Sequence, residues 1–215
     1  MAALQRIETP RLILRRWLRS DREPFAAMNA DPEVMRYFPA ALDRSTSDGL
    51  AERLDAGFDL HGHGRWALER RDTREFIGFT GLGPMPADVP GSGGLEIGWR
   101  VARAHWRQGF AIEAATAALD AAFAPDRDAA SAALPDAASA ALLEVNSITA
   151  VINEPSRAVM RRLGMRHVDD FAHPVVPEGS PIKVHVRYVL TRDDWMRSRV
   201  RTPRSDVPPR ARARG

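Results

Sequence analysis

The stretch Leu95–Ala115, LEIGWRVARAHWRQGFAIEAA, decides how this chain is expected to fold. Residues 95–101 are predicted to form a β-strand. From about Gln108 to Phe123 the apolar residues recur at the spacing of a helix that packs one face on a core. Gly109 lies where the strand gives way to the helix. Two interpretations fit this turn: a plain strand-to-helix connection, or a cradle for phosphate.

The phosphate interpretation has a physical basis. The first turn of a helix leaves several N–H groups unpaired and carries a partial positive charge. Gly109 would let the backbone approach an anion closely, and Arg107 would add charge. Other glycine patterns fit worse: the chain lacks the Gly-Lys-Ser/Thr of a P-loop, and GFTGLG at 78–83 has the wrong spacing for a dinucleotide fingerprint. GSGGLEIG at 91–98 leads into a strand instead of out of one.

Outward from this stretch, the remaining patterns alternate between strands and helices. Further strands are predicted at 11–17, 65–71, 75–85, 147–153, 165–171 and 183–191. Further helices are predicted after Asp21, at 31–39, at 47–60 and at 154–164. This order indicates an α+β, mixed α/β domain with a largely antiparallel sheet.

One domain is expected over residues 7–195. An Ala-rich insertion at about 124–141 contains Pro125 and Pro135, which prevent one long helix. Residues 196–215 are expected to be a disordered basic tail. This tail has seven arginines and one aspartate, so its net charge is +6, and the total of +3 leaves −3 for the rest. Nucleic acid is therefore not expected as a partner, except through this tail.

Composition excludes several classes of chemistry. The chain has no cysteine, so it has no disulfide, no thiolate metal ligand and no thiol nucleophile. No apolar run approaches the ~20 residues of a membrane span. His61 and His63 have a spacing that metal ligands can have, but they are interpreted as loop residues, and no metal is expected. A cytoplasmic protein without a membrane partner is the simplest expectation.

Two motifs together resemble a known family. LEIGWRVARAHWRQGFAIEAA resembles the acetyl-coenzyme-A-binding motif of the GNAT N-acetyltransferases, in which a Gln/Arg-x-x-Gly-x-Gly/Ala turn holds the pyrophosphate. NEPSRAVMRRLGM at 153–165 is similar to the family's Asn-x-x-Ser…Leu-Gly-Phe/Met segment. IETPRLILRRW at 7–17, VMRYFP at 34–39 and HPVVPEGSP at 173–181 are similar to the RimJ/RimL subgroup, which acetylates the N-termini of ribosomal proteins. The resemblance covers residues 7–191 in motif order.

The resemblance implies a fold and a cosubstrate. The fold would be GNAT-like, with a central, mostly antiparallel sheet of six to seven strands and about four flanking helices. The cosubstrate would be acetyl-CoA, whose pantetheine arm pairs with the backbone of residues 99–101. Asn153 would bond the same arm, although an asparagine there is equally typical of a turn or cap. The residues implied to bind acetyl-CoA are Trp99, Arg100, Val101, Arg107, Gln108, Gly109, Phe110, Ala111, Ile112 and Asn153.

The implied chemistry is acyl transfer from a thioester to an amine. Because there is no cysteine, direct attack by the amine is favoured over an acyl-enzyme. The N–H of Val101 would polarise the thioester carbonyl. Glu96 is the candidate base, and its alternative role is to pair with an arginine. Many family members have a tyrosine acid where this chain has Met160, so Ser156 is the candidate acid, with helix capping as its alternative.

The acceptor is expected to be a protein N-terminal α-amine or a small-molecule amine. An α-amine with a pKa of ~7.7–8.0 is already partly neutral at pH 7, whereas a lysine at ~10.4 is not. Tyr37, Phe38 and Trp66 either line the acceptor cleft or belong to the core. A non-catalytic acyl-CoA-binding or regulatory domain is the alternative to an enzyme, and a homodimer is compatible with the sequence.

Overall fold

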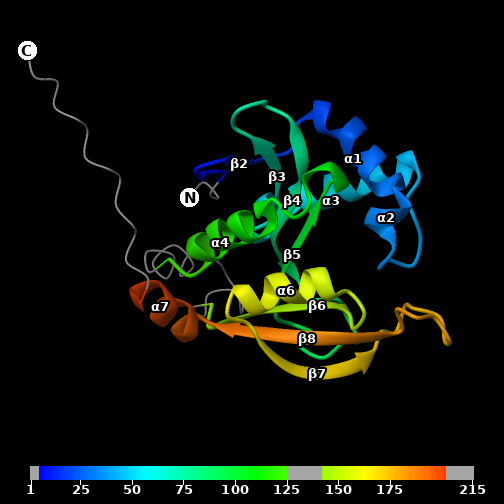
Figure 1. The fold of residues 1–215 in the computed structure, drawn as a ribbon, viewed down its shortest axis with the longest axis vertical. Coiled ribbons are helices and arrows are strands. Elements are labelled where there is room, and N and C mark those ends of the chain that lie inside the picture. Colours follow the sequence, from blue (N-terminus) through cyan, green and yellow to red (C-terminus); the bar gives the residue numbers. More distant parts are fainter. Residues whose placement is uncertain (1–4, 125–141, 202–215) are drawn as a thin grey trace, which may run out of the picture.

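The computed structural model describes residues 5–124 and 142–201, which form one eight-stranded sheet and the helices that cover it (Figure 1). The strand order is β1-β2-β3-β4-β5-β6-β8-β7. All neighbouring strands are antiparallel except β5 and β6, which are parallel. The strands are β1 (Arg6–Glu8), β2 (Leu12–Arg15), β3 (Arg65–Arg70), β4 (Phe76–Pro84), β5 (Leu95–Val101), β6 (Glu144–Ala150), β7 (Arg166–Ala172) and β8 (Val184–Thr191).

Six α-helices are described, and two 3-10 turns lead into helices. The helices are α1 (Arg22–Ala30), α2 (Pro32–Met35), α3 (Arg44–His61), α4 (Phe110–Ala122), α6 (Glu154–Arg162) and α7 (Arg192–Arg201). The 3-10 turns are η1 (Arg19–Asp21) and η2 (Arg103–His105). No helix in the described ranges is long and apolar enough to cross a membrane.

The two faces of the sheet carry different helices. On one face, α4 buries Ala114, Ala118 and Leu119 in a core that also contains Leu68 of β3. Ala67, the neighbour of Leu68, lies in a separate cluster with residues of α1 and α3, because successive side chains of a strand point to opposite faces. The helices α1 to α3 therefore cover the other face of the β3–β4 region (Figure 1).

The sheet separates between β5 and β6. These strands share one ladder pair, Glu96 with Asn146, although β5 has seven residues and so has β6. The strands β1 to β5 form one part of the sheet, and β6, β8 and β7 form the other, with α4 on the first part and α6 on the second (Figure 1). The C-terminal half of β5 thus has a free edge inside the molecule.

The predicted fold class is confirmed, and two numbers are corrected. The sheet has eight strands instead of six to seven, because the three-residue β1 has too few residues to show a pattern. The described helices are six instead of about four, partly because α7 extends into the predicted tail. Residues 196–201 are thus helical and not disordered. Residues 202–215 and most of the predicted insertion, 125–141, lie outside the described residues.

The helix α7 is attached to the domain through Trp195. This side chain is only 4% exposed, and its indole N–H donates to Asp120 of α4 at 3.1 Å. Arg199, one turn later, also pairs with Asp120, at 2.6 Å. The arginines of residues 196–201 indicated a solvated tail, but the buried Trp195 next to them holds this segment on α4.

Candidate active site

The free edge of β5 presents backbone groups to the gap. The carbonyl of Ile97 accepts a hydrogen bond from the Ser147 hydroxyl of β6 at 2.9 Å, so alternate peptide groups of β5 point toward β6. Trp99, two residues later, points its N–H and C=O in the same direction, because peptide groups repeat their direction every second residue. At that position β6 no longer pairs with β5. The Trp99 peptide groups therefore face the gap.

Val101 continues this edge, and Arg100 does not. The carbonyl of Val101 accepts a hydrogen bond from the indole N–H of Trp106 at 2.7 Å. The backbone N–H of Val101 points to the gap, because Val101 lies two residues after Trp99. The N–H of Ala102 donates to Ile77 of β4, and bonded pairs alternate along an antiparallel ladder. The peptide groups of Arg100 are thus turned toward β4. Of the three residues predicted to pair with pantetheine, two offer backbone groups to the gap.

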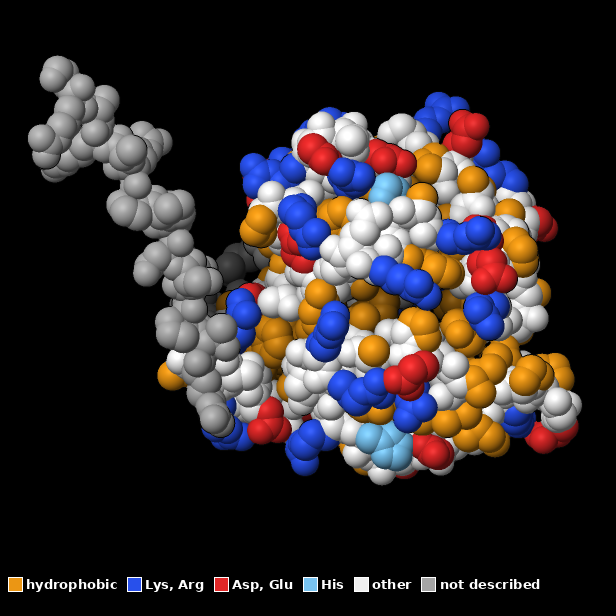
Figure 2. Space-filling view, in the orientation of Figure 1, with side chains coloured by type: hydrophobic (Ala, Val, Ile, Leu, Met, Phe, Trp, Pro, Cys, Tyr) orange, Lys and Arg blue, Asp and Glu red, His pale blue; other side chains and the backbone are white. Residues whose placement is uncertain are grey.

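The gap leads to the N-terminal end of α4. Gly109 is the N-cap of this helix and adopts a left-handed φ of 82°. Arg107 also has a positive φ, 60°, which is strained for a residue with a side chain. Two left-handed residues within three positions turn the chain sharply from η2 into α4. In the orientation of Figure 1, Figure 2 shows a hollow between the parts of the surface that carry α4 and α6, with hydrophobic side chains inside and Lys and Arg at its rim.

Arg11, which is far from this turn in the sequence, contacts it in the fold. Its guanidinium donates to the Gln108 carbonyl at 2.8 Å and pairs with Glu113 at 2.6 Å. It also lies over the Phe110 ring, 4.6 Å from the centroid. A Cβ atom on Gly109 would lie 3.3 Å from the Arg11 Nη2 atom. Arg11 therefore places a second cation, besides Arg107, at the turn, which no local sequence signal indicated.

Gln108, Ala111 and Ile112 complete the turn. The amide of Gln108 donates to the carbonyl of Ala104 at 3.0 Å, so this side chain folds back on η2. Ala111 and Ile112 are partly buried and pack against the main core. Their contribution to an anion site is the peptide N–H of the first helical turn and not the side chain.

Glu96 lies on the face of the sheet that α1 to α3 cover. Its carboxylate accepts from Arg65 of β3 at 2.5 Å, and the two side chains are only 15% and 20% exposed. A Cβ atom on Gly83 or Gly98 would lie 3.5 Å from the Arg65 guanidinium. The Arg65 side chain thus packs over Gly83 and Gly98, which have no side chains, and reaches Glu96. The structure places the candidate base in an arginine pair, the alternative that the sequence left open.

Arg100 lies four residues further along the same face of β5. It donates to Asn29 of α1 at 2.5 Å and stacks on the ring of Phe38, 4.1 Å from the centroid. Burial, together with the nearby charge of Arg65, lowers the pKa of Arg100 to about 10. Phe38 is 39% exposed, whereas Trp66 is 1% exposed and packs in the core. Of the aromatic residues considered for the acceptor cleft, Phe38 therefore lies beside the site, whereas Trp66 belongs to the core.

Asn153 and Ser156 lie at the start of α6. Asn153 is the N-cap: its side-chain oxygen accepts from the Ser156 N–H at 3.3 Å, and its amide donates to Thr149 at 2.8 Å. The capping role is thus observed. Ser156 lies one helical turn before Met160, which is fully buried in the core, so both residues are on the inward face of α6.

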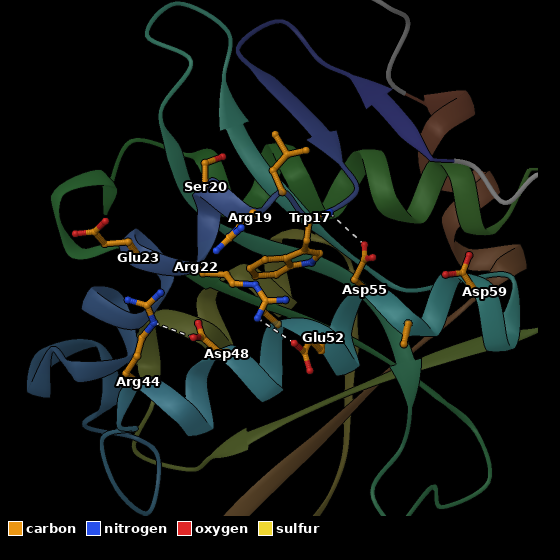
Figure 3. Close-up of a pocket in the computed structure, with 13 residues that line it drawn as sticks. Trp17, Arg19, Ser20, Arg22, Glu23, Arg44, Asp48, Glu52, Asp55 and Asp59 are labelled. Carbon is orange, nitrogen blue, oxygen red and sulfur yellow. Dashed lines mark hydrogen bonds and ion pairs between the residues drawn. The ribbon is translucent and has the colours of Figure 1, made fainter.

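The described residues offer no metal centre, since no group of three or more His, Cys, Asp or Glu side chains could hold an ion. A cavity of about 690 Å³ lies elsewhere, between η1 and α3. Figure 3 shows it lined by charged side chains that pair with one another, such as Arg22 with Glu52 and Arg44 with Asp48. It contains none of the predicted site residues, so it is not the candidate active site.

Comparison with known proteins agrees with this geometry. A family model described as an acetyltransferase (GNAT) domain matches residues 11–166. The uncharacterized N-acetyltransferase YoaA of Bacillus subtilis is 26% identical over 189 residues, which are 86% of this chain and 96% of that protein. FsC-acetyl coenzyme A-N(2)-transacetylase of Aspergillus fumigatus is 29% identical over 189 residues, 82% of this chain and 72% of that protein. Mycobacterium smegmatis RimJ in complex with CoA-disulfide has a similar fold, with a TM-score of 0.63, 18% identity and coverage of 85% of this chain and 83% of that chain.

Proposed function

Because this chain belongs to the GNAT acetyltransferase family and is an N-acetyltransferase, we propose that it holds acetyl-CoA in the gap between β5 and β6 and transfers the acetyl group directly to a primary amine. The observation that carries the proposal is the free edge of β5, which leads to the Gly109 turn. The family and the relatives favour an enzyme over a non-catalytic acyl-CoA-binding domain.

The donor would be held at three places. The peptide groups of Trp99 would pair with the pantetheine arm as an added strand, and the N–H of Val101, whose carbonyl accepts from Trp106, would face the thioester carbonyl. The N–H groups at 107–112 would take the pyrophosphate, with Arg107 and Arg11 supplying charge. The second amide hydrogen of Asn153, not engaged with Thr149, would bond the pantetheine arm. One helix dipole contributes only ~0.3–1 kcal/mol, so micromolar affinity, about 8 kcal/mol, needs all of these contacts.

The reaction needs two proton transfers. The amine nitrogen attacks the thioester carbonyl carbon, the C–S bond breaks, and the nitrogen loses a proton. Glu96 would accept this proton directly or through a water, while the N–H of Val101 stabilises the developing oxyanion. The Ser156 hydroxyl would donate a proton to the leaving thiolate, because the thioether of Met160 cannot. The chain has no cysteine, so no acyl-enzyme on a thiol can form.

The acceptor would be a protein N-terminal α-amine, as in the RimJ/RimL subgroup, or a small amine. An α-amine is partly neutral at pH 7, so it needs only a modest base. An acceptor screen tests the function: acetyl-CoA is supplied with peptides that begin with alanine or serine and, side by side, with small amines, and free thiol is measured. We expect thiol release that depends on an acceptor. Binding of acetyl-CoA without acceptor-dependent release from any amine would instead identify a binding domain.

A further inference from the structure

Arg100 is a largely buried cation without a carboxylate partner. Within the described ranges it makes no ion pair; its one hydrogen bond goes to the neutral side chain of Asn29, and its Nε atom has no partner. The rings of Phe38 and Phe79 flank the guanidinium. Removing a charge from water without an opposite charge is costly, and burial lowers the pKa of this group to about 10. None of these contacts supplies the opposite charge.

A second arginine adds to the uncompensated positive charge around Arg100. Arg65 is close enough to oppose the charge of Arg100, and Arg65 is already paired with Glu96. Of these two guanidinium groups, only that of Arg65, on β3, is paired with the Glu96 carboxylate. Gly98 lies between Glu96 and Arg100 on the same face and has no side chain, and the Arg65 guanidinium occupies the space over it. Arg100, next along this face, is thus the cation that no carboxylate of the described residues neutralises.

We propose that Arg100 binds a carboxylate of the amine acceptor, so that this enzyme selects acceptors with an anionic group near the reacting amine. The proposal rests on the proposed function, since it presumes that the amine is at Glu96. Both ends of the acceptor would then meet an opposite charge, the amine at Glu96 and the carboxylate at Arg100. Free amino acids and peptides with an acidic residue near the N-terminus share this chemistry.

Matched pairs of acceptors test the proposal on the wild-type enzyme. One pair is a free amino acid and its amide; the other is two peptides that differ by aspartate or asparagine at the second position. The kcat/KM values are expressed per neutral amine, because the carboxylate also changes the pKa of the amine. We expect a preference of about 10- to 100-fold for the acidic member of at least one pair, the size of a charge-assisted hydrogen bond. The pair that shows it tells free amino acids from peptides, and equal values in both pairs would overturn the proposal.

Variants assign the preference to Arg100. Arg100→Met keeps the length and the contact with Phe38 but removes the charge, so the acid-to-amide ratio should fall to about one while the amide is still acetylated. Arg100→Lys should keep part of the ratio, and it remains informative if Arg100→Met does not fold. Arg36→Met is the control, because Arg36 is an exposed arginine that stacks on Tyr37. A ratio that survives in Arg100→Met would contradict the assignment.

A binding experiment separates this proposal from the proposed function. If no amine in the panel is acetylated, catalysis fails, and the subsite is then tested by calorimetry with N-acetylated amino acids and their amides in the presence of CoA. We expect the acids to bind at least 10-fold more tightly. Equal binding, or no binding of the acids, would overturn the carboxylate subsite whatever the outcome for catalysis.

Discussion

Glu96 is paired with Arg65, and this pair is compatible with the role of base that we propose for it. The pair with Arg65 fixes its position, and a carboxylate can accept a proton from an amine. The residue was found from the sequence because it lies on the strand of the longer motif. Arg65 was not found, since it lies 31 positions away and only the antiparallel pairing of β3, β4 and β5 brings it close.

The Glu96→Gln variant tests the catalytic role. We expect kcat/KM to fall by about 10²- to 10⁴-fold, because the amide cannot take up the proton, while the Kd of acetyl-CoA stays within about threefold. Steady-state kinetics and calorimetry give the two values. If Glu96 only balances Arg65, the variant is less stable, since it leaves a partly buried arginine unpaired, and its activity per folded molecule equals that of the wild type.

At the scale of elements, the Asn153 cap of α6 can be separated from any contact with pantetheine. Aspartate caps a helix as well as asparagine but has no amide hydrogens. Asn153→Asp should therefore keep the free energy of unfolding and weaken acetyl-CoA binding. Asn153→Ala should lose about 1 kcal/mol of stability as well. Denaturation measures the stability, and calorimetry measures the affinity for acetyl-CoA. If Asn153→Asp binds acetyl-CoA as tightly as the wild type, Asn153 only caps the helix.

The β7–β8 pair carries a prediction on pH. His185 is buried on β8 with its ring 4.6 Å from that of His173, and burial lowers its pKa from 6.5 to about 4. The unfolded chain binds this proton already below pH 6.5, and the folded protein only near pH 4. The neutral histidine therefore contributes stability above pH 6.5, which is lost as the pH falls from 6.5 to about 4.

The Tm measured across this pH window tests the sign. Wild type should lose Tm toward pH 4 more steeply than His185→Gln, in which the group does not titrate. His61→Gln, at the exposed end of α3, is the control and should follow the wild type. Parallel curves for wild type and His185→Gln would show that His185 is not held neutral.

The elements were largely predictable where the local pattern was strong. The strand at 95–101 has the predicted bounds, and the helix predicted from Gln108 begins two residues later, at Phe110. The strand predicted at 147–153 instead ends at Ala150, because the chain turns there and Asn153 caps the next helix. The pairings between β5 and β6 and between α4 and the N-terminal Arg11 depend on contacts distant in sequence, so no local pattern contains them.

At the scale of the whole molecule, the sheet consists of two parts that meet at one ladder pair. Glu96 pairs with Asn146, and Ser147 adds one hydrogen bond to Ile97. A ligand that contacts β5, the α4 turn and α6 would connect the two parts. At a concentration 100 times its Kd it should stabilise the fold by about 2.7 kcal/mol through mass action. If acetyl-CoA binds at the gap as proposed, its binding would therefore stabilise the contact between the two parts of the sheet.

The most direct test of this account is the Kd of acetyl-CoA, measured by calorimetry for Gly109→Ala and Gly164→Ala. Both glycines have a φ of 82°, so alanine strains the backbone at each to a similar degree. Only Gly109 lies at the proposed pyrophosphate turn, where a Cβ would also lie 3.3 Å from Arg11. We predict at least 10-fold weaker binding for Gly109→Ala and a change within about twofold for Gly164→Ala. Equal affinity of both variants and the wild type would contradict the placement of acetyl-CoA at this turn.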